Sequence, residues 1–501
     1  MSLPSTAISS PLLEQTFRRT WPELVVPQAP LVTHSSPGRI DVLGGLAAEV
    51  GGVVAQMALS RRASVAVQWR TDGQLALYSA RLTPATGPNP IILSADQFSA
   101  TPGTPMRSPQ ELLNLLPRTI PATDAAGSQP WAAPLVALFE LVLSHPQLAT
   151  AGPLRDRHTG RFTGATVFIH SDIPMHAGQA SSTAVITALT QAICRCLPVA
   201  VSTVEKAVLI QQAQNMFGGT GSHVVDALTT LCALDGPPAH ILRYNAQPHD
   251  LIGQIPLPPD VKILALNTGV PALKGGQTVR SLRLAGAMGL QIIQVIYNDL
   301  GRQEAPLHGY LGNLSPSLYR RYFRALLPRR LRGRDFVRSY GPLPPSAGEI
   351  QPDQLYRVRT AIDHLISEHE HAEHFLHEME QPAEPISSDR RARALRDLTL
   401  RRAGRLLLAS HHSYRLRLGL SCWQADWLID RLMSFGPEHG IFGGRISECG
   451  GGGTVTVLTD TSAASAEAIL EVMHAYRTTI GSALHVDVAG GPGSAGALLV
   501  K

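Results

Sequence analysis

Hydrophobic side chains recur along the first half of the chain with two different periods. Residues 12–24 carry Leu13, Phe17, Trp21 and Leu24 at helical spacing, which predicts a helix. Short apolar runs predict strands at residues 31–35, 53–57, 63–68, 74–78 and 165–170. Longer stretches predict helices at residues 110–116, 131–144, 181–196 and 204–217.

The second half of the chain continues this mixture. Strands are predicted at residues 261–267 and 455–458, and helices at residues 282–299, 355–380, 389–410, 424–432 and 464–477. Strands and helices in this order favour an α+β fold over an all-helical or all-β one. Proline-rich stretches within residues 236–260 predict a boundary, so we expect an N-terminal domain of residues 1–245 and a C-terminal domain of residues 246–501.

Composition limits the kind of protein. With 44% hydrophobic and 16% charged residues among 501, the chain can bury a large core. No uninterrupted apolar stretch reaches the ~20 residues of a membrane helix. The five cysteines form no CxxC metal pair and no disulfide framework. We therefore expect a cytoplasmic protein without a membrane partner.

The charge is modest, at a formal net value of +5. Arginines gather at residues 320–321, 329–334 and 390–393, without the interleaved aromatic residues that stack on single-stranded nucleic acid. We expect no nucleic-acid partner. These arginines are solvated helix faces and a basic loop, or they attract a phosphorylated ligand. The alternating His and Glu side chains of residues 364–380 indicate a solvated, salt-bridged helix rather than a metal site.

Two segments have the chemistry of a phosphate site. Residues 174–184 follow a predicted strand, and their glycine and small hydroxyl residues open a helix. Free N–H groups and the helix dipole both favour an anion there, although the same residues could be a plain N-cap. Residues 450–453 are four glycines that lead into a strand, which indicates either a close backbone approach or a flexible turn.

Two further segments carry charged candidates. Residues 36–45 form a Pro-Gly turn followed by Arg39 and a run that ends in two glycines. Residues 218–226 are a glycine-rich loop that ends at Asp226, a carboxylate that could orient a hydroxyl or simply cap a helix.

In this order and spacing, the four segments resemble the galactokinase branch of the GHMP small-molecule kinases, and within it the L-arabinokinases. The resemblance covers roughly residues 15–495. It implies a two-domain α+β GHMP kinase fold with the active site in the cleft between the domains. It also implies an ATP-dependent kinase that phosphorylates the anomeric hydroxyl of a monosaccharide, such as L-arabinose or galactose, and uses Mg²⁺.

The resemblance assigns roles residue by residue. Asp226 and Arg39 would be catalytic, Asp226 as the acid/base or orienting carboxylate and Arg39 at the transferring phosphoryl group. Gly450, Gly451, Gly452 and Gly453 would close on the site. The ATP phosphates would lie against His176, Ala177, Gly178, Gln179, Ala180, Ser181, Ser182 and Thr183. The sugar would contact Arg39, Gly45, Glu49 and Asp226, and the metal would be held by Ser181, Ser182 and Gln214.

Several positions depart from the family pattern. Ala48 replaces a sugar-binding Asp, Val279 a sugar-contacting Tyr and Gln214 a metal-binding Glu. Ala180 replaces the first Ser of the phosphate loop, and Glu448 and Cys449 replace two glycines of the third motif. Glu49, one residue after Ala48, could supply the missing carboxylate. The departures leave two alternatives open, another GHMP metabolite kinase and a catalytically impaired protein that binds a sugar or nucleotide.

Overall fold

The computed structural model describes most of the chain, and residues 218–221 of the predicted glycine-rich loop lie outside the described residues. The described ranges are 11–80, 90–98, 106–116, 131–148, 152–156, 158–216, 222–233, 238–247, 250–272, 276–299, 307–344, 347–380 and 390–490. The chain divides into two compact units. Unit 1 comprises Met1–Gly38, Arg61–Met175 and Ala180–Cys232, and unit 2 comprises Arg39–Ser60, His176–Gln179 and Ala233–Lys501.

Unit 1 is built on a mixed sheet. Its strands run in the order β4 (Ile91–Ser94), β3 (Gln74–Ser79), β5 (Ala165–Ser171) and β2 (Val53–Trp69), and β1 (Val32–Leu43) pairs with β2. The β3–β5 pair is parallel, whereas β5 pairs with β2 in antiparallel register. The chain passes between the units within β1 and within β2, so each of these long strands belongs to both.

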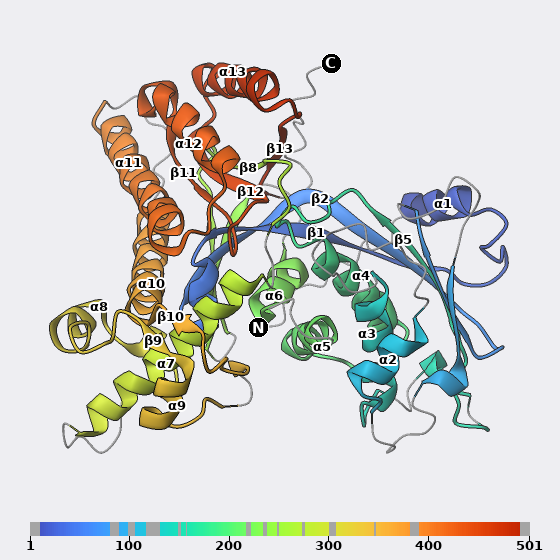
Figure 1. The fold of residues 1–501 in the computed structure, drawn as a ribbon. Helices are drawn as coiled ribbons and strands as arrows, with labels where there is room; N and C mark the ends of the chain where they lie inside the picture. Colours follow the sequence, from blue (N-terminus) through green and yellow to red (C-terminus); the bar gives the residue numbers. More distant parts are fainter. Residues whose placement is uncertain are drawn as a thin grey trace. The chain divides into compact units, whose positions relative to one another are not determined.

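Helices cover both faces of the sheet of unit 1. The helix α1 (Pro11–Thr20) packs Phe17 and the following Trp21 on Phe168 and Ala66. On the opposite face in Figure 1 lies the group of α3 (Ala133–Ser144), α4 (Ser181–Arg195), α5 (Thr203–Asn215) and α6 (Val224–Cys232). These four helices pack on one another, and α4 also packs on β5, while α2 (Pro109–Leu115) packs on α3.

Unit 2 contains an antiparallel sheet of four strands. Their order is β11 (Ile441–Ile446), β12 (Thr454–Asp460), β8 (Val261–Asn267) and β13 (His485–Val488). The first residues of β2 pair with β6 (His240–Asn245), which pairs with β7 (Asp250–Pro256). The ends of β1 and β2 that belong to this unit contribute Ile40, Val42 and Val53 to its core.

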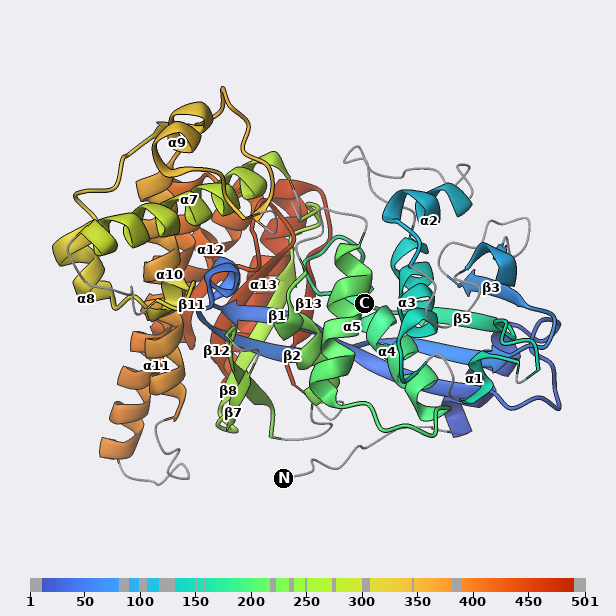
Figure 2. The same cartoon turned by 90° about the horizontal axis from the view of Figure 1, so that it is seen from below.

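Long helices complete unit 2. The helices α10 (Val358–Glu380) and α11 (Arg390–His412) run side by side in Figure 2, α10 also packs on α7 (Gln277–Asp299), and α11 packs along β11. The helix α12 (Trp423–Phe435) lies between β11 and α13 (Ala463–Ile480). Short elements are η1 (Gly45–Val50), η4 (Leu311–Asn313), α8 (Pro316–Leu318), η5 (Tyr319–Phe323), β9 (Leu331–Arg332), α9 (Gly333–Tyr340), β10 (Leu355–Tyr356) and η7 (Ser413–Leu418).

The mixed α and β content agrees with the expected α+β fold class, and most predicted helices and strands are present. The strands predicted at residues 53–57 and 63–68 are parts of a single strand, because β2 continues through the half-buried Arg61 and Arg62. The strands β6 and β7 were missed because the prolines of residues 237–259 indicated a linker, whereas Pro256 only ends β7. The domain boundary after residue 245 stays a prediction.

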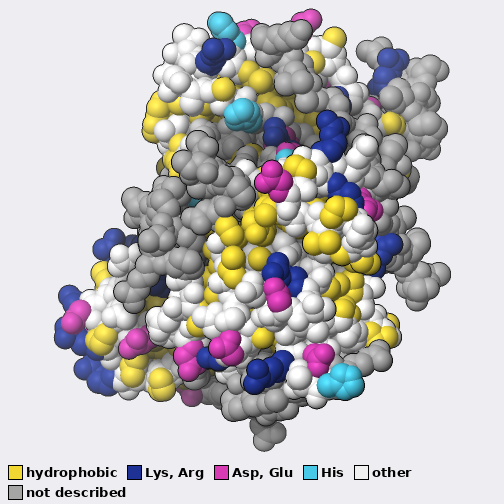
Figure 3. All heavy atoms as spheres, turned by 90° about the vertical axis from the view of Figure 1, so that its right-hand side faces the viewer, with side chains coloured by type: hydrophobic (Ala, Val, Ile, Leu, Met, Phe, Trp, Pro, Cys, Tyr) yellow, Lys and Arg dark blue, Asp and Glu magenta, His cyan; other side chains and the backbone are white. Residues whose placement is uncertain are grey.

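The described surface carries mixed charges. On the face drawn in Figure 3, basic and acidic side chains of the described residues are scattered among apolar ones. Among the helices that the structure describes, none combines the length and apolar character needed to cross a membrane.

Candidate active site

The segment of residues 174–184, which we call the phosphate loop, has an unusual backbone. Three of its residues have positive φ angles, His176 at 57°, Gly178 at 74° and Ala180 at 58°. When residues in the left-handed conformation alternate with residues in the right-handed one, successive backbone N–H groups point to one side. These N–H groups then form a concave site for an anion. A left-handed non-glycine residue is strained and persists where the surrounding structure holds it, often at functional sites.

Contacts within unit 2 hold the middle of this loop. The Thr454 hydroxyl donates to the Ala177 carbonyl at 2.6 Å, and the Ala272 N–H donates to the His176 carbonyl at 2.8 Å. The Arg39 N–H donates to the Gln179 carbonyl at 3.1 Å. Three successive contacts with the rest of unit 2 therefore hold the carbonyls of His176, Ala177 and Gln179.

The loop then enters α4 of unit 1. Ala180 occupies the N-cap position, and no side chain caps this helix. The first N–H groups of an α-helix have no intrahelical partner, so an uncapped N-terminus favours an anion. Ser181, Ser182 and Thr183 form the first turn, where their hydroxyls can add donors.

Gln214 of α5 binds the hydroxyls of that first turn. Its Nε2 donates to Ser182 Oγ at 3.2 Å and to Thr183 Oγ1 at 2.9 Å. Its Oε1 accepts a hydrogen bond from the Ser222 hydroxyl. We call Ser182, Thr183, Gln214 and Ser222 the hydroxyl group of the site; these hydrogen bonds among its members are neutral.

This arrangement bears on the predicted metal site. Mg²⁺ prefers oxygen ligands, usually one or two carboxylates together with substrate phosphates. Gln214 directs its N–H₂ toward Ser182 and Thr183, and no carboxylate takes part in the hydroxyl group. Across the described ranges, no set of three or more His, Cys, Asp or Glu side chains could hold a metal ion. The metal role of Ser181, Ser182 and Gln214 stays a prediction.

Asp226 lies in the first turn of α6 and is buried, with 4% of its surface exposed. The residue at the entry of α6, Ser222, is tied to the end of α5. Its N–H donates to Asn215 Oδ1 at 3.0 Å, and its carbonyl accepts from Asn215 Nδ2 at 2.9 Å. The end of α5 therefore fixes where α6 begins and hence where Asp226 stands.

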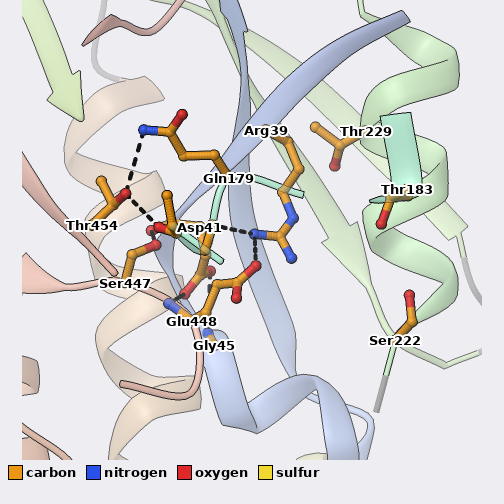
Figure 4. A network of polar contacts seen from close by, with 12 residues as sticks. Arg39, Asp41, Gly45, Gln179, Thr183, Ser222, Thr229, Ser447, Glu448 and Thr454 are labelled. Atoms are coloured by element: carbon orange, nitrogen blue, oxygen red, sulfur yellow. Dashed lines mark hydrogen bonds and ion pairs between the residues drawn. The ribbon is translucent and has the colours of Figure 1, made fainter. Parts of the chain in front are cut away.

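Arg39 is buried in unit 2 beside the phosphate loop. Its Nη1 donates to the Gly178 carbonyl at 3.3 Å and forms an ion pair with Glu448 (Figure 4). The exposed fractions of the Arg39 and Glu448 side chains are 3% and 5%. The Glu448 carboxylate also lies within 3.5 Å of where a Cβ of Gly178 would stand. A negative group therefore lies against both the arginine and the loop.

A second buried arginine, Arg445 of β11, binds two further carboxylates. Its Nη1 is 2.8 Å from Asp41 Oδ2, and its Nη2 is 3.3 Å from Glu368 Oε1. Its Cζ lies 5.1 Å from the ring centre of Tyr414, whose hydroxyl donates to the Glu448 carbonyl at 2.7 Å. We call Arg39, Asp41, Glu368, Arg445 and Glu448 the ionic group of the site.

Burial and charge compete within the ionic group. Burial raises the pKa of the Asp41 carboxyl, although Arg445 opposes it. Burial would also raise the pKa of Glu368, but Arg445 and His364 outweigh it, so this pKa lies below its ordinary value. Burial lowers the pKa of His364, which is fully buried beside Ser413, to about 4. Within the ionic group the surroundings therefore favour the charge of Glu368 and oppose that of Asp41, and they oppose protonation of the neighbouring His364.

The glycine loop of residues 450–453 passes close to other backbone. All four glycines have positive φ. A Cβ on Gly450 would lie 2.1 Å from the Leu420 carbonyl oxygen, and one on Gly453 would lie 2.9 Å from the Ala177 carbonyl oxygen. The loop therefore needs glycine for both its conformation and its space, and it adjoins the part of the phosphate loop that belongs to unit 2.

Comparison with known proteins supports the resemblance drawn from the sequence. The model of the GHMP kinases N-terminal domain matches residues 148–233. The chain is 26% identical to the L-arabinokinase of Arabidopsis thaliana over 492 residues, which is 89% of this chain and 44% of that protein. It is 24% identical to the galactokinase of Bos taurus over 302 residues, which is 60% of this chain and 61% of that protein. The chain thus spans less than two thirds of the length of these two relatives.

Solved structures share the fold. The galactokinase of Lactococcus lactis, solved in complex with galactose, superposes with a TM-score of 0.64 at 17% identity, over 96% of this chain and 97% of that one. The mevalonate kinase of Methanococcus jannaschii gives a TM-score of 0.51 at 12% identity, over 93% of this chain and 99% of that one. The chain is therefore similar in sequence to an L-arabinokinase and to galactokinases, and it shares the fold of these two solved kinases.

Two of the predicted sugar-binding positions, Gly45 and Glu49, have close neighbours within unit 2. A Cβ on Gly45 would lie 2.6 Å from the Tyr414 hydroxyl, so the residue is confined to glycine by a close neighbour. Glu49 of η1 forms an ion pair with Arg283 of α7. Val279 is fully buried in the core of unit 2. The sugar roles of Gly45 and Glu49 stay predictions.

The structure brings the predicted residues into two groups, one in each unit. Unit 2 joins Arg39 to Gly178, and unit 1 joins Gln214 to Ser182 and Thr183. Sequence reasoning missed Asp41, Arg445 and Glu368. Only Asp41 had a local signal, because it lies two residues after Arg39, on the same face of β1.

Proposed function

We propose that this chain is an ATP-dependent sugar kinase that converts a monosaccharide, L-arabinose or a galactose-like sugar, into its 1-phosphate. The observation that carries the proposal is the buried Arg39 guanidinium on the carbonyl of Gly178, within a loop whose backbone favours an anion. The similarity to L-arabinokinase and galactokinase supports the substrate class.

In the proposed reaction, the anomeric hydroxyl oxygen attacks the γ-phosphorus of ATP. The bond between the γ-phosphorus and the β,γ-bridging oxygen breaks, and ADP leaves with that oxygen. Phosphoryl transfer depends mainly on positioning and on neutralising charge. The N–H groups of residues 176–183 would hold the phosphates, and Arg39 would stabilise the charge on the phosphoryl oxygens.

Asp226 would accept the proton of the sugar hydroxyl as the oxygen–phosphorus bond forms. A buried carboxylate whose position is fixed by the start of α6 suits an orienting base. ATP would arrive with Mg²⁺ on its phosphates, where the ion neutralises charge. Ala48 stands where the family has a sugar-binding Asp, and the space that this shorter side chain leaves would be filled by the sugar itself or by Glu49. A cytoplasmic location goes with this proposal, since the reaction consumes ATP.

The ion pair between Arg39 and Glu448 sets a condition on this reaction. As long as Glu448 neutralises the guanidinium, Arg39 offers less attraction to a phosphoryl group. Binding of ATP would therefore have to draw Arg39 away from Glu448 or share it. This condition is absent from a site in which glycine occupies position 448.

The test is a coupled ADP-release assay over a panel of monosaccharides that includes L-arabinose and galactose, with Mg²⁺ and with Mn²⁺. We expect sugar-dependent ADP release, a sugar 1-phosphate as product, and a fall in kcat of about 10²–10⁴-fold in Asp226→Asn. The matched control is Asp397→Asn, a half-buried carboxylate on α11 that pairs with Arg401 of the same helix, which should leave kcat unchanged. ADP release that no sugar raises above background would refute the kinase.

A second candidate is a protein that binds sugar or nucleotide without transfer. The occupation of Arg39 by Glu448 and the neutral Gln214 favour it. Calorimetry would then show saturable binding of the sugar or ATP, with no turnover in the coupled assay. Sugar-dependent turnover that Asp226→Asn abolishes would exclude this candidate.

A further inference from the structure

Unit 2 contains a cavity of about 480 Å³ that is separate from the residues of the ionic group. Its lining residues are Tyr319, Arg320, Arg324, Asp363, Ile366, Ser367 and Arg417. Small-molecule sites typically have volumes of roughly 300–1,000 Å³. The cavity therefore has room for a small organic molecule and not only for a single inorganic ion.

The charge of the lining is positive. The lining holds three arginines and one aspartate, and Glu370 outside the lining neutralises Arg320, which leaves a surplus of one positive charge. Arg324 binds Asp363 through both nitrogens of its fork, at 2.8 and 3.0 Å, and Arg320 pairs with Glu370. Arg417 is exposed and lines the cavity. Among the described residues, no carboxylate forms an ion pair with it. One of the three guanidinium groups is therefore not neutralised by a carboxylate.

The backbone around the cavity is also unusual. Tyr319 and Arg320 belong to η5, and Arg417 belongs to η7; both elements are π-helices. Single-turn π-helical segments are rare in proteins and frequent at functional sites. Here both segments line the same cavity and supply two of its three arginines.

We propose that this cavity binds a phosphorylated small molecule, at a site distinct from the one used for phosphoryl transfer. A guanidinium fork matches the oxygens of a phosphate with two parallel hydrogen bonds. Arg417 would take the phosphate, because Arg320 and Arg324 are already paired with Glu370 and Asp363. Ser367 can add a hydrogen bond, and the buried Ile366 can contact the apolar part of the ligand.

The segment η7 links this cavity to the ionic group. Three residues before Arg417, Tyr414 donates its hydroxyl to the Glu448 carbonyl and stacks on Arg445. Ser413 of the same segment contacts His364 at 2.9 Å. A ligand that orders η7 through Arg417 would therefore also order the residues that surround Glu448.

The test is hydrogen exchange of the full chain with pyrophosphate as the probe. We expect pyrophosphate to slow amide exchange in residues 319–324 and 413–418, and calorimetry to show an affinity that Arg417→Gln lowers about tenfold. Arg417→Lys, which keeps the charge but loses the fork, should retain part of the affinity. The matched control is Arg405→Gln, an exposed arginine on α11 away from the cavity, which should behave as wild type.

The phosphate loop could also bind pyrophosphate. The residues whose amide exchange slows therefore show which of the two sites holds the probe. Protection confined to residues 174–184, or equal affinity in wild type and Arg417→Gln, would overturn the proposal. Citrate, an anion without phosphate, is the second probe, and equal protection by citrate would overturn the assignment to phosphate. None of these outcomes depends on whether the chain phosphorylates a sugar.

Discussion

The hydroxyl group of unit 1 and the ionic group of unit 2 are held by different chemistry. Gln214 joins Ser182, Thr183 and Ser222 through neutral hydrogen bonds, whereas Arg39 and Arg445 join three buried carboxylates. A neutral hydrogen bond contributes about 0.5–1.5 kcal/mol, and its loss is tolerated. A buried charge that loses its partner is far more costly. The two groups should therefore differ in their response to mutation, pH and ligands.

The largest difference should appear when one member of each group is removed. Arg445→Met leaves Asp41 and Glu368 buried without their cation, so the free energy of unfolding should fall by about 3–5 kcal/mol. Ser222→Ala removes one neutral hydrogen bond and should cost about 1–2 kcal/mol. Urea denaturation measures both. The control Arg405→Met, at an exposed site, should stay within about 0.5 kcal/mol of wild type. Equal losses in Arg445→Met and Ser222→Ala would refute the comparison.

The ionic group also shows where reading the sequence reaches its limit. Arg39 and the glycines of residues 450–453 could be found because local backbone chemistry marks them. Arg445 and its partner Asp41 lie 404 positions apart, so no local pattern joins them. Glu368 and His364 were assigned to a solvated helix face, and that assignment was wrong, since both are buried. Their partners on β11 and η7 exist only in the folded chain.

More of the hydroxyl group could be predicted from the sequence. Residues 174–184 carried the pattern of a helix N-terminus that favours an anion or is a plain N-cap, and Gln214 was found through the family pattern. The sequence could not predict the direction of the Gln214 amide, because that direction depends on the Ser222 hydroxyl, which donates to Gln214 Oε1 in the folded chain. The left-handed Ala180 was also hidden, since alanine gives no sign of a positive φ.

The second difference concerns pH. Burial lowers the pKa of His364 to about 4, below the value of about 6.5 in an unfolded chain. Between these values the unfolded state binds more protons, so stability is full above pH 6.5 and is lost as the pH falls toward 4. The loss of stability due to protonation of His364 should reach about 2–3 kcal/mol. The hydroxyl group contains no titratable side chain and should add nothing to this loss.

Urea denaturation at several pH values tests this expectation. His364→Asn should flatten the slope of stability against pH between 6.5 and 4, whatever its effect at pH 7. The control His474→Asn, at an exposed site on α13, should keep the slope of wild type. A slope that stays the same in His364→Asn would show that other groups carry the acid sensitivity.

A third prediction separates the two groups by their response to ATP. Glu448→Gln removes the charge that neutralises Arg39, so the affinity for ATP should rise about tenfold. Equilibrium binding of ATP measures this without relying on turnover. Glu438→Gln, which removes an exposed partner of Arg401, is the matched control and should leave the affinity unchanged. Weaker ATP binding in Glu448→Gln would mean that Glu448 positions Arg39 rather than competing for it.

The smallest expected effect comes from giving the hydroxyl group a charge. In Gln214→Glu, the hydroxyls of Ser182, Thr183 and Ser222 can all turn to donate to the new carboxylate, so the protein should lose only about 1 kcal/mol. The carboxylate would also supply the oxygen ligand that Mg²⁺ prefers. Saturating Mg²⁺ should therefore return about 1 kcal/mol of stability to Gln214→Glu and much less to wild type. The matched control is Gln212→Glu, on the exposed face of α5 two residues earlier. If Mg²⁺ stabilises Gln212→Glu as much as Gln214→Glu, the hydroxyl group is not a place where one carboxylate creates a metal site.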